Sequence, residues 1–278
     1  MFVADRLVYL DLHKTGCTHI RRLLAGVTSG QRIGKHNRIT EDLLGRYVLG
    51  SIRNPWDWYV SLWAYGVGGR GAIRARVVTR TDLSYYHRQL PKEMGKNWLT
   101  TREALLSAIH DAIKPVARWR ETYGDAEDVE RFRSWLSLLF SPDRRYDLGE
   151  GFGLSPLSRH AGLLTYRYLK LYSRAITGLY SDRRLRTCGG VREFNEEHNV
   201  LDGVIRMESL EEDFIRAMAQ AGYRLTPEQE AAVWSAGGHK TNASDRRPAS
   251  YYYDDETVAL VASRERLIIE TYGYLPPV

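Results

Sequence analysis

Residues 7–24 read LVYLDLHKTGCTHIRRLL and join a strand, a loop and a helix start in one continuous stretch. An apolar run typical of a buried strand ends at Leu12, and a short polar turn follows it. Apolar residues then recur at helical spacing from Ile20 onward. A helix start directs backbone N–H groups toward the loop, and Lys14 adds a full positive charge. The stretch therefore predicts a phosphate-binding site near the N-terminus.

The loop does not follow the common nucleotide-binding signatures. No glycine precedes Lys14 as the pattern G-x-x-x-x-G-K-[ST] requires, and the dinucleotide pattern G-x-G-x-x-G is missing. Gly16 would let the backbone approach a ligand closely. An ordinary strand–turn–helix with a surface lysine is the alternative. We expect the loop and the first helical turn to contact the phosphate through Lys14, Thr15, Gly16, Cys17, Thr18 and His19.

A second strand–helix junction follows later in the sequence. Residues 47–52, YVLGSI, predict a buried strand. Asn54 fits a helix N-cap, and Pro55 fits the first helical position. Arg53 at the strand end and Ser61 in the second helical turn can then converge on one anion. Arginine offers a planar fork of donors and serine a short hydroxyl, so this pair also suits phosphate.

Taken together, the two motifs resemble the nucleotide site of sulfotransferases that use 3′-phosphoadenosine 5′-phosphosulfate (PAPS). The order Lys-Thr-Gly-x-Thr at residues 14–18 is similar to their 5′-phosphosulfate loop. Arg53 and Ser61 match the two functional positions of their 3′-phosphate motif. Residues 204–214 and 239–274 resemble late segments of Golgi-type and bacterial carbohydrate sulfotransferases. One departure is His13, since many relatives carry proline before the loop lysine.

The resemblance covers residues 1–66 and 200–278, which would form the nucleotide-binding core of a single domain. It implies an α/β fold of three layers with a central, mostly parallel sheet and a P-loop-like phosphate site. Residues 67–199 would form a large, mainly helical insertion on the acceptor side. The implied reaction moves a sulfuryl group from PAPS to a hydroxyl of a glycan or small-molecule acceptor and releases 3′-phosphoadenosine 5′-phosphate (PAP).

Local patterns agree with a sheet built from βαβ units, because each predicted strand precedes a helix signal. The predicted strands are Leu7–Leu12, Tyr47–Ile52 and Val204–Met207. Capping boxes are predicted at Ser209 and Thr226, and a last helix is predicted from Asp254 or Asp255 to Gly273. Within the insertion, helical spacing is predicted for residues 102–113, 127–140 and 166–180, and a loop for residues 66–96.

The predicted loop of residues 66–96 is rich in arginine and aromatic side chains, which suit contacts with a sugar or an anion. A solvated loop is the alternative. The residues concerned are Arg70, Arg74, Arg76, Arg80, Tyr85, Tyr86, His87 and Arg88. Trp56 and Trp58 are predicted to pack in the core rather than against adenine.

Sulfuryl transfer requires a general base and a group that neutralises the leaving oxygen. Lys14 can neutralise the bridging oxygen without a metal. His36 is predicted to be the base, because it lies between the two phosphate motifs in a strand-to-helix loop. The catalytic histidine of heparan sulfate 2-O- and 6-O-sulfotransferases is similar in order and context. His13 and Glu208 are alternative candidates for the general base, and His87, His160 and His239 are further candidates.

The C-terminal polar loop, residues 237–247, is predicted to close over the nucleotide. Two adjacent glycines begin it, and donor side chains follow. We expect cofactor contacts from Lys240, Asn242 and Arg246, with Arg247 as a further donor.

Composition fits this interpretation without deciding it. The 278 residues are 43% hydrophobic and carry a net charge of +6, which suits an anionic nucleotide but is too mild to indicate nucleic acid. Two cysteines fit a reducing compartment, and no metal-ligand spacing, signal peptide or membrane span is evident. We therefore expect a cytoplasmic, bacterial-type enzyme without a metal. A P-loop-like ATP-dependent kinase and a non-catalytic nucleotide- or glycan-binding protein are the alternatives.

Overall fold

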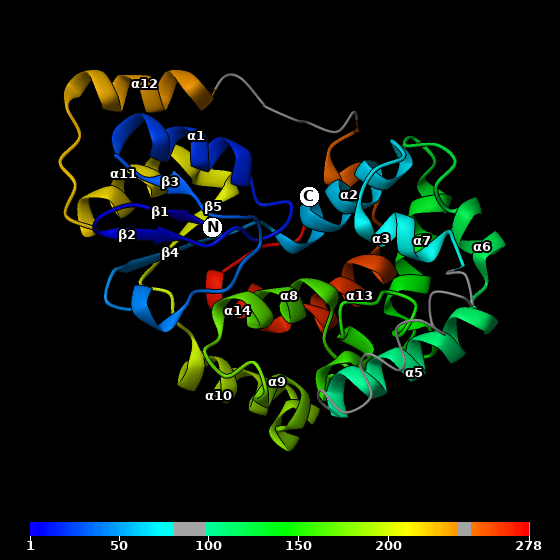
Figure 1. Cartoon of the computed structure of the whole chain (residues 1–278). Helices are drawn as coiled ribbons and strands as arrows, with labels where there is room; N and C mark the ends of the chain where they lie inside the picture. The colour runs from blue at the N-terminus through cyan, green and yellow to red at the C-terminus, as the bar shows by residue number, and fades with distance from the viewer. Residues whose placement is uncertain (81–97, 238–245, 278) are drawn as a thin grey trace.

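The described part of the chain folds around one five-stranded sheet in the order β3-β1-β2-β4-β5. In this computed structural model, residues 1–80, 98–237 and 246–277 are described (Figure 1). The predicted α/β class is confirmed, but the sheet is mixed. β2 pairs with β4 and β4 with β5 in parallel, whereas β1 pairs with β2 and β3 antiparallel. The strands are β1 Phe2–Val3, β2 Leu7–Tyr9, β3 Gln31–Arg32, β4 Tyr47–Ile52 and β5 Gly203–Arg206.

The helices outnumber the strands and fill most of the middle of the chain. Those packed near the sheet or ending the chain are α1 Cys17–Val27, α2 Pro55–Val67, α11 Leu210–Gln220, α12 Pro227–Gly237, α13 Asp255–Arg264 and α14 Arg266–Tyr272. Between α2 and β5 lie α3 Ala72–Val77, α5 Trp98–Ile113, α6 Val116–Glu121, α7 Val129–Phe140, α8 Leu163–Tyr172, α9 Gly178–Ser181 and α10 Cys188–His198. Short 3₁₀ turns are η1 Glu41–Leu43, η2 Pro142–Arg144, η3 Phe152–Leu154, η4 Pro156–Arg159, η5 Arg183–Arg186, η6 Met207–Ser209 and η7 Ala249–Tyr251.

Both faces of the sheet are covered, because alternate residues of a strand point to opposite sides. Leu7 and Tyr9 of β2 join a core cluster with α1, α11 and α12. Val8 joins a larger cluster with α2, α7, α8 and α13. Figure 1 shows α1, α11 and α12 on one side of the sheet and the larger helical part on the other. Trp56 and Trp58 are 2% and 0% exposed, so their predicted place in the core is confirmed.

Several predicted helix starts rest on local side-chain bonds. Asn54 caps α2 by accepting a hydrogen bond from the Trp56 N–H at 3.1 Å. Thr226 and Gln229 exchange the two bonds of a capping box, at 3.0 and 3.3 Å. The capping box predicted at Ser209 is wrong: its hydroxyl contacts the Asp213 carboxylate at 3.1 Å instead of a backbone N–H.

Several predicted boundaries differ from the structure. The strand predicted over Leu7–Leu12 ends at Tyr9, and the strand predicted over Val204–Met207 spans Gly203–Arg206. The region expected to be a loop begins with the end of α2 and includes the helix α3, while residues 81–97 lie outside the described part. The helix expected over residues 166–180 ends at Tyr172. The single last helix is two, because α13 ends at Arg264 and α14 begins at Arg266. The residue between them, Glu265, is fully buried.

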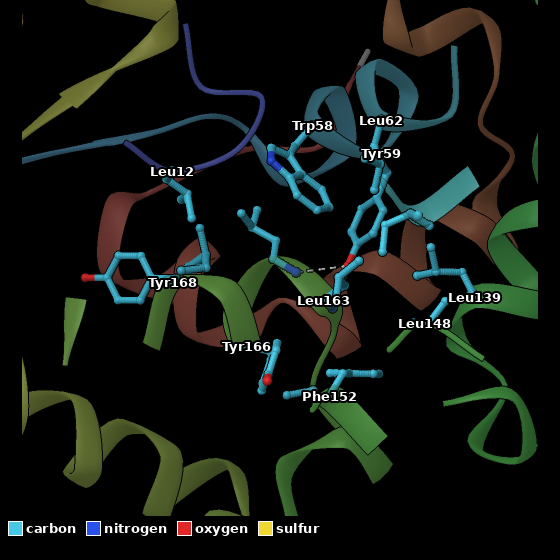
Figure 2. Packing of buried hydrophobic residues seen from close by; sticks show 14 of the residues in the cluster. Leu12, Trp58, Tyr59, Leu62, Leu139, Leu148, Phe152, Leu163, Tyr166 and Tyr168 are labelled. Atoms are coloured by element: carbon cyan, nitrogen blue, oxygen red, sulfur yellow. Dashed lines mark hydrogen bonds between the residues drawn. The ribbon is translucent and has the colours of Figure 1, made fainter. Parts of the chain in front are cut away.

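The Glu265 side chain links the α13–α14 junction to the start of α8 by hydrogen bonds. Its carboxylate accepts hydrogen bonds from the Thr165 N–H at 2.8 Å, the Thr165 hydroxyl at 2.6 Å and the Leu164 N–H at 3.2 Å. The Tyr59 hydroxyl donates to Glu265 and accepts from the Leu163 N–H at 3.1 Å. Figure 2 shows this contact between Tyr59 and Leu163 amid packed apolar side chains. One carboxylate thus links α2, α8 and both C-terminal helices.

Replacing Glu265 with alanine should lower the free energy of unfolding by about 3 kcal/mol or more, because several buried donors lose their acceptor. Urea unfolding of the full chain measures this. Glu256→Ala, at an exposed position in α13, is the matched control and should change stability by under about 1 kcal/mol. Equal effects of the two variants would contradict the assigned role.

The same carboxyl group predicts a pH dependence of stability. Burial raises the pKa of Glu265 to about 7, above its value in an unfolded chain. The stabilisation from this group is therefore fully present below about pH 4.5 and is lost as pH rises through about 7. Glu265→Gln should flatten this part of the stability profile.

Candidate functional site

One face of α2 carries the polar side chains of the candidate site. Asp57, Ser61 and Tyr65 are spaced by four residues and so lie on one helical face, with Arg53 just before the helix. Arg53 Nε donates to Asp57 Oδ2 at 2.6 Å. Arg246 Nη2, from far along the chain, donates to Asp57 Oδ1 at 2.5 Å. Asp57 therefore holds two guanidinium groups side by side at the start of α2.

The loop between β2 and α1 lies against this face. Lys14 and Gly16 both adopt the left-handed backbone region, with φ of 65° and 75°. The Lys14 carbonyl accepts a hydrogen bond from Arg53 Nη1 at 3.3 Å. The Lys14 ammonium lies 4.0 Å from the centroid of the Tyr65 ring, and the Arg70 guanidinium carbon lies 4.5 Å from the same centroid. We call Lys14, Arg53, Arg70 and Arg246 the cation cluster.

The cation cluster keeps an excess of positive charge. Burial would raise the pKa of Asp57, but its two arginine partners outweigh this and lower it, so the group is a carboxylate. Burial lowers the pKa of Lys14 to about 8, and the neighbouring arginines add to this effect. Arg53, Arg70 and Arg246 act on Lys14 as like charges, and a multiply charged anion relieves that repulsion.

The predicted phosphate-loop residues divide into those that face the core and those that stay accessible. The Thr15 hydroxyl donates to the Leu12 carbonyl at 2.7 Å, and the Cys17 thiol donates to the same oxygen at 2.7 Å. Both side chains are buried, so only their backbone groups remain for a ligand. Thr18 is exposed in the first turn of α1. His19 is buried, which lowers its pKa.

Ser61 remains a candidate ligand-binding hydroxyl. It is 4% exposed. Its place between Asp57 and Tyr65 on α2 puts it on the face that carries the cation cluster. Lys240 and Asn242, also predicted to bind the nucleotide, lie outside the described residues.

His36 and His13 form a second feature next to the loop. Their rings stack with centroids 3.4 Å apart and planes 13° apart. His36 has a φ of 57°, and its Nδ1 lies 2.7 Å from the Asp11 carbonyl oxygen. A carbonyl only accepts, so Nδ1 carries the proton and Nε2 holds the free lone pair. Burial lowers the pKa of both histidines, that of His13 to about 2, so both are neutral at pH 7.

Consecutive residues of the loop thus face two different surroundings. Lys14 belongs to the cation cluster, whereas the strongest electrostatic neighbours of His13 are Arg167 and His36. Arg167 makes a two-pronged ion pair with Glu150, at 3.0 and 2.6 Å. The two neighbouring residues therefore differ in their electrostatic surroundings.

The other candidate bases have different surroundings. Glu208 accepts from the Asn54 N–H at 2.7 Å and from the Tyr274 hydroxyl at 3.1 Å, so both carboxylate oxygens hold structural bonds. His160 lies beside Cys188, in a separate cavity. His87 and His239 lie outside the described residues.

The sequence did not identify Tyr65 as part of the site, and it predicted that Arg70 contacts the acceptor. The four-residue spacing from Arg53 to Tyr65 could have predicted that these side chains share one face of α2 and that Tyr65 lies beside the cations. Two other arginines of the predicted basic stretch lie beside Lys114: the Arg76 backbone carbonyl accepts from Lys114 Nζ at 2.8 Å, and Arg80 Nη2 donates to the Lys114 carbonyl at 3.4 Å.

Two features are absent from the described part of the chain. Among residues 1–80, 98–237 and 246–277, no group of three or more histidine, cysteine, aspartate and glutamate side chains could hold a metal ion. In the same described part, no helix is both long and apolar enough to cross a membrane. Comparisons of the chain with protein-family models, curated proteins and solved structures each found no match.

Proposed function

We propose that this chain is a PAPS-dependent sulfotransferase that acts on a hydroxyl of a glycan or small-molecule acceptor. The observation that carries the proposal is the cation cluster beside the loop of a strand–loop–helix unit. Ammonium, guanidinium, hydroxyl and backbone N–H groups are all donors suited to phosphate and sulfate oxygens. Such a donor set fits a nucleotide that bears two separate phosphate positions and a sulfate.

In this proposal the two motifs divide the nucleotide between them. Backbone N–H groups of residues 14–18 and the Lys14 ammonium would hold the 5′-phosphosulfate. Arg53 and Ser61 would hold the 3′-phosphate, and Arg246 would approach it from the C-terminal segment. Asp57 keeps Arg53 and Arg246 in place and moderates their mutual repulsion.

His36 and Lys14 would serve the two ends of the transfer. His36 Nε2 accepts the proton of the acceptor hydroxyl while that oxygen forms a bond to sulfur. The bond between sulfur and the bridging phosphate oxygen breaks, and its electron pair stays on that oxygen. Lys14 neutralises the charge that develops there. The neutral tautomer of His36 and the charged form of Lys14 are both available near pH 7.

A thermal-shift series on the full chain tests the proposal. PAP should raise the melting temperature more than ATP does at equal concentration, because only PAP presents a 3′-phosphate. Stabilisation by ATP with none by PAP would overturn the proposal in favour of a kinase. Stabilisation by PAP without any transfer from PAPS to a panel of glycan and phenolic acceptors would favour a binding protein, and a response to heparin alone would do the same.

Arg53→Ala should weaken PAP binding by about 10- to 100-fold, the usual loss for hydrogen bonds to a charged group. Turnover at saturating PAPS should fall much less, because Arg53 is expected to meet the 3′-phosphate in both ground and transition states. Isothermal titration with PAP measures the first effect and saturation kinetics the second. Arg224→Ala, at an exposed position after α11, is the control. An unchanged dissociation constant for PAP would remove Arg53 from the site.

A further inference from the structure

A separate cavity lies between the segment after η4 and the helices α10, α13 and α14. It is open to solvent and has a volume of about 20 Å³, and none of its lining residues belongs to the cation cluster. The charged and titratable groups that line it are His160, Cys188, Arg192, Arg264, Arg266 and Glu270. Glu270 pairs with Arg192 and lies 3.7 Å from Arg266, so the lining keeps a positive excess.

A thiol and an imidazole face each other in this cavity. Cys188 is a free, exposed cysteine at the first position of α10, and its Sγ lies 3.9 Å from His160 Nδ1. His160 Nε2 lies 2.8 Å from the Leu185 carbonyl oxygen and must donate to it. The lone pair of Nδ1 therefore points to the thiol, which is the arrangement that lets an imidazole take a thiol proton.

We propose that Cys188 and His160 form a thiol-modification site for small anionic disulfides. His160 Nδ1 takes the proton of Cys188, and the thiolate attacks one sulfur of the disulfide. A new S–S bond forms at Cys188, the original S–S bond breaks, and its electron pair leaves on the second sulfur, which then takes up a proton. The disulfide is the oxidant, and the protein thiol is what it oxidises.

The charge of the cavity sets the class of partner. Arg192, Arg264 and Arg266 line the cavity together with Cys188, and Glu270 is the acidic residue of the same lining, so a carboxylate-bearing disulfide is attracted and a cationic one repelled. Cys17 provides an internal reference, because its thiol is buried and donates to the Leu12 carbonyl. The inference does not depend on the proposed sulfotransferase activity.

The test follows modification of the native full chain at pH 7 by intact-mass spectrometry and peptide mapping. Oxidised glutathione is the anionic probe and cystamine is the cationic probe. For each probe, the rate with Cys188 is divided by the rate of the same probe with N-acetylcysteine. We expect Cys188 to react at least about tenfold faster than N-acetylcysteine with oxidised glutathione, with Cys17 unmodified. The scaled rate with cystamine should be several-fold lower.

Two variants separate the imidazole from the surrounding charge. His160→Asn should slow the reaction about tenfold with both probes, whereas Arg192→Gln should reduce only the preference for the anionic probe. Circular dichroism checks that each variant is folded. The proposal is overturned if wild-type Cys188 reacts no faster than N-acetylcysteine, a result that needs no variant, or if folded His160→Asn reacts as fast as wild type.

Discussion

Replacing Lys14 with alanine is expected to lower kcat by about a thousandfold, with a much smaller change in the KM for PAPS. The ammonium would act on charge that develops only as the bridging oxygen leaves, so its loss raises the barrier more than it weakens binding. Its place in the cation cluster, 4.0 Å from the Tyr65 ring centroid, supports this role. Steady-state kinetics at varied PAPS concentration separate the two constants.

Arg70→Gln is the matched comparison for Lys14→Ala, because both side chains lie over the ring of Tyr65. Arg70 is exposed and is expected to add only to the attraction of the nucleotide, so its loss should raise the KM and largely spare kcat. Equal effects of the two variants, confined to KM, would refute a leaving-group role for Lys14.

The pH dependence provides a second check on Lys14. Its pKa is lowered to about 8, and the active form is the protonated one. The kcat/KM of the free enzyme should therefore fall as pH rises through about 8. Lys14→Arg keeps a charge at all working pH values and should lose this alkaline decline whatever its absolute activity. A wild-type profile that stays flat to pH 10 would argue against it.

His36→Asn should lower kcat by about 10²- to 10⁴-fold and leave the affinity for PAP nearly unchanged. Asparagine suits this position, since it tolerates the left-handed backbone at a φ of 57° and can still donate to the Asp11 carbonyl. The variant therefore removes the proton acceptor with little structural disturbance. Turnover assays and titration with PAP measure the two effects, with His198→Asn on α10 as a matched exchange outside the site.

The acid side of the profile tests the same residue. Burial lowers the pKa of His36 below its usual value of about 6.5, so activity should persist at pH 6.5 and decline only at lower pH as the imidazole takes up a proton. Near-normal turnover of His36→Asn would transfer the role to another group. His13 is the first to examine, because its ring stacks on His36.

Local features of the fold could be predicted where their bonds close within a few residues. Asn54 caps α2 through an N–H two residues away, and Thr226 and Gln229 form their capping box across a single turn. The strand Tyr47–Ile52 has the predicted bounds because one continuous apolar run defines it. Ser209 shows the limit even here, since the nearby Asp213 carboxylate competes for its hydroxyl.

The candidate site was predicted only in outline. The order of Lys14, Arg53 and Ser61 along two strand–helix junctions was visible, because parallel neighbouring strands bring their ends together. The stacking of His36 on His13 and the approach of Arg70 to the Tyr65 ring were not, since each depends on a loop conformation that no periodicity encodes.

The sequence by itself determined the α/β class, the two strand–loop–helix units and the residue types that suit an anion. Only the tertiary structure decided that Arg246 meets Asp57 across 189 residues of chain, and that Glu265 divides the last helix to reach α8. The antiparallel pairing of β1 and β3 at the edge of the sheet is also visible only in the structure. Each of these strands has two residues, which is too short to show the alternation typical of a strand. The physical reason is the range of the interactions: caps and amphipathic faces are satisfied locally, whereas buried charges take whichever partner the fold brings to them.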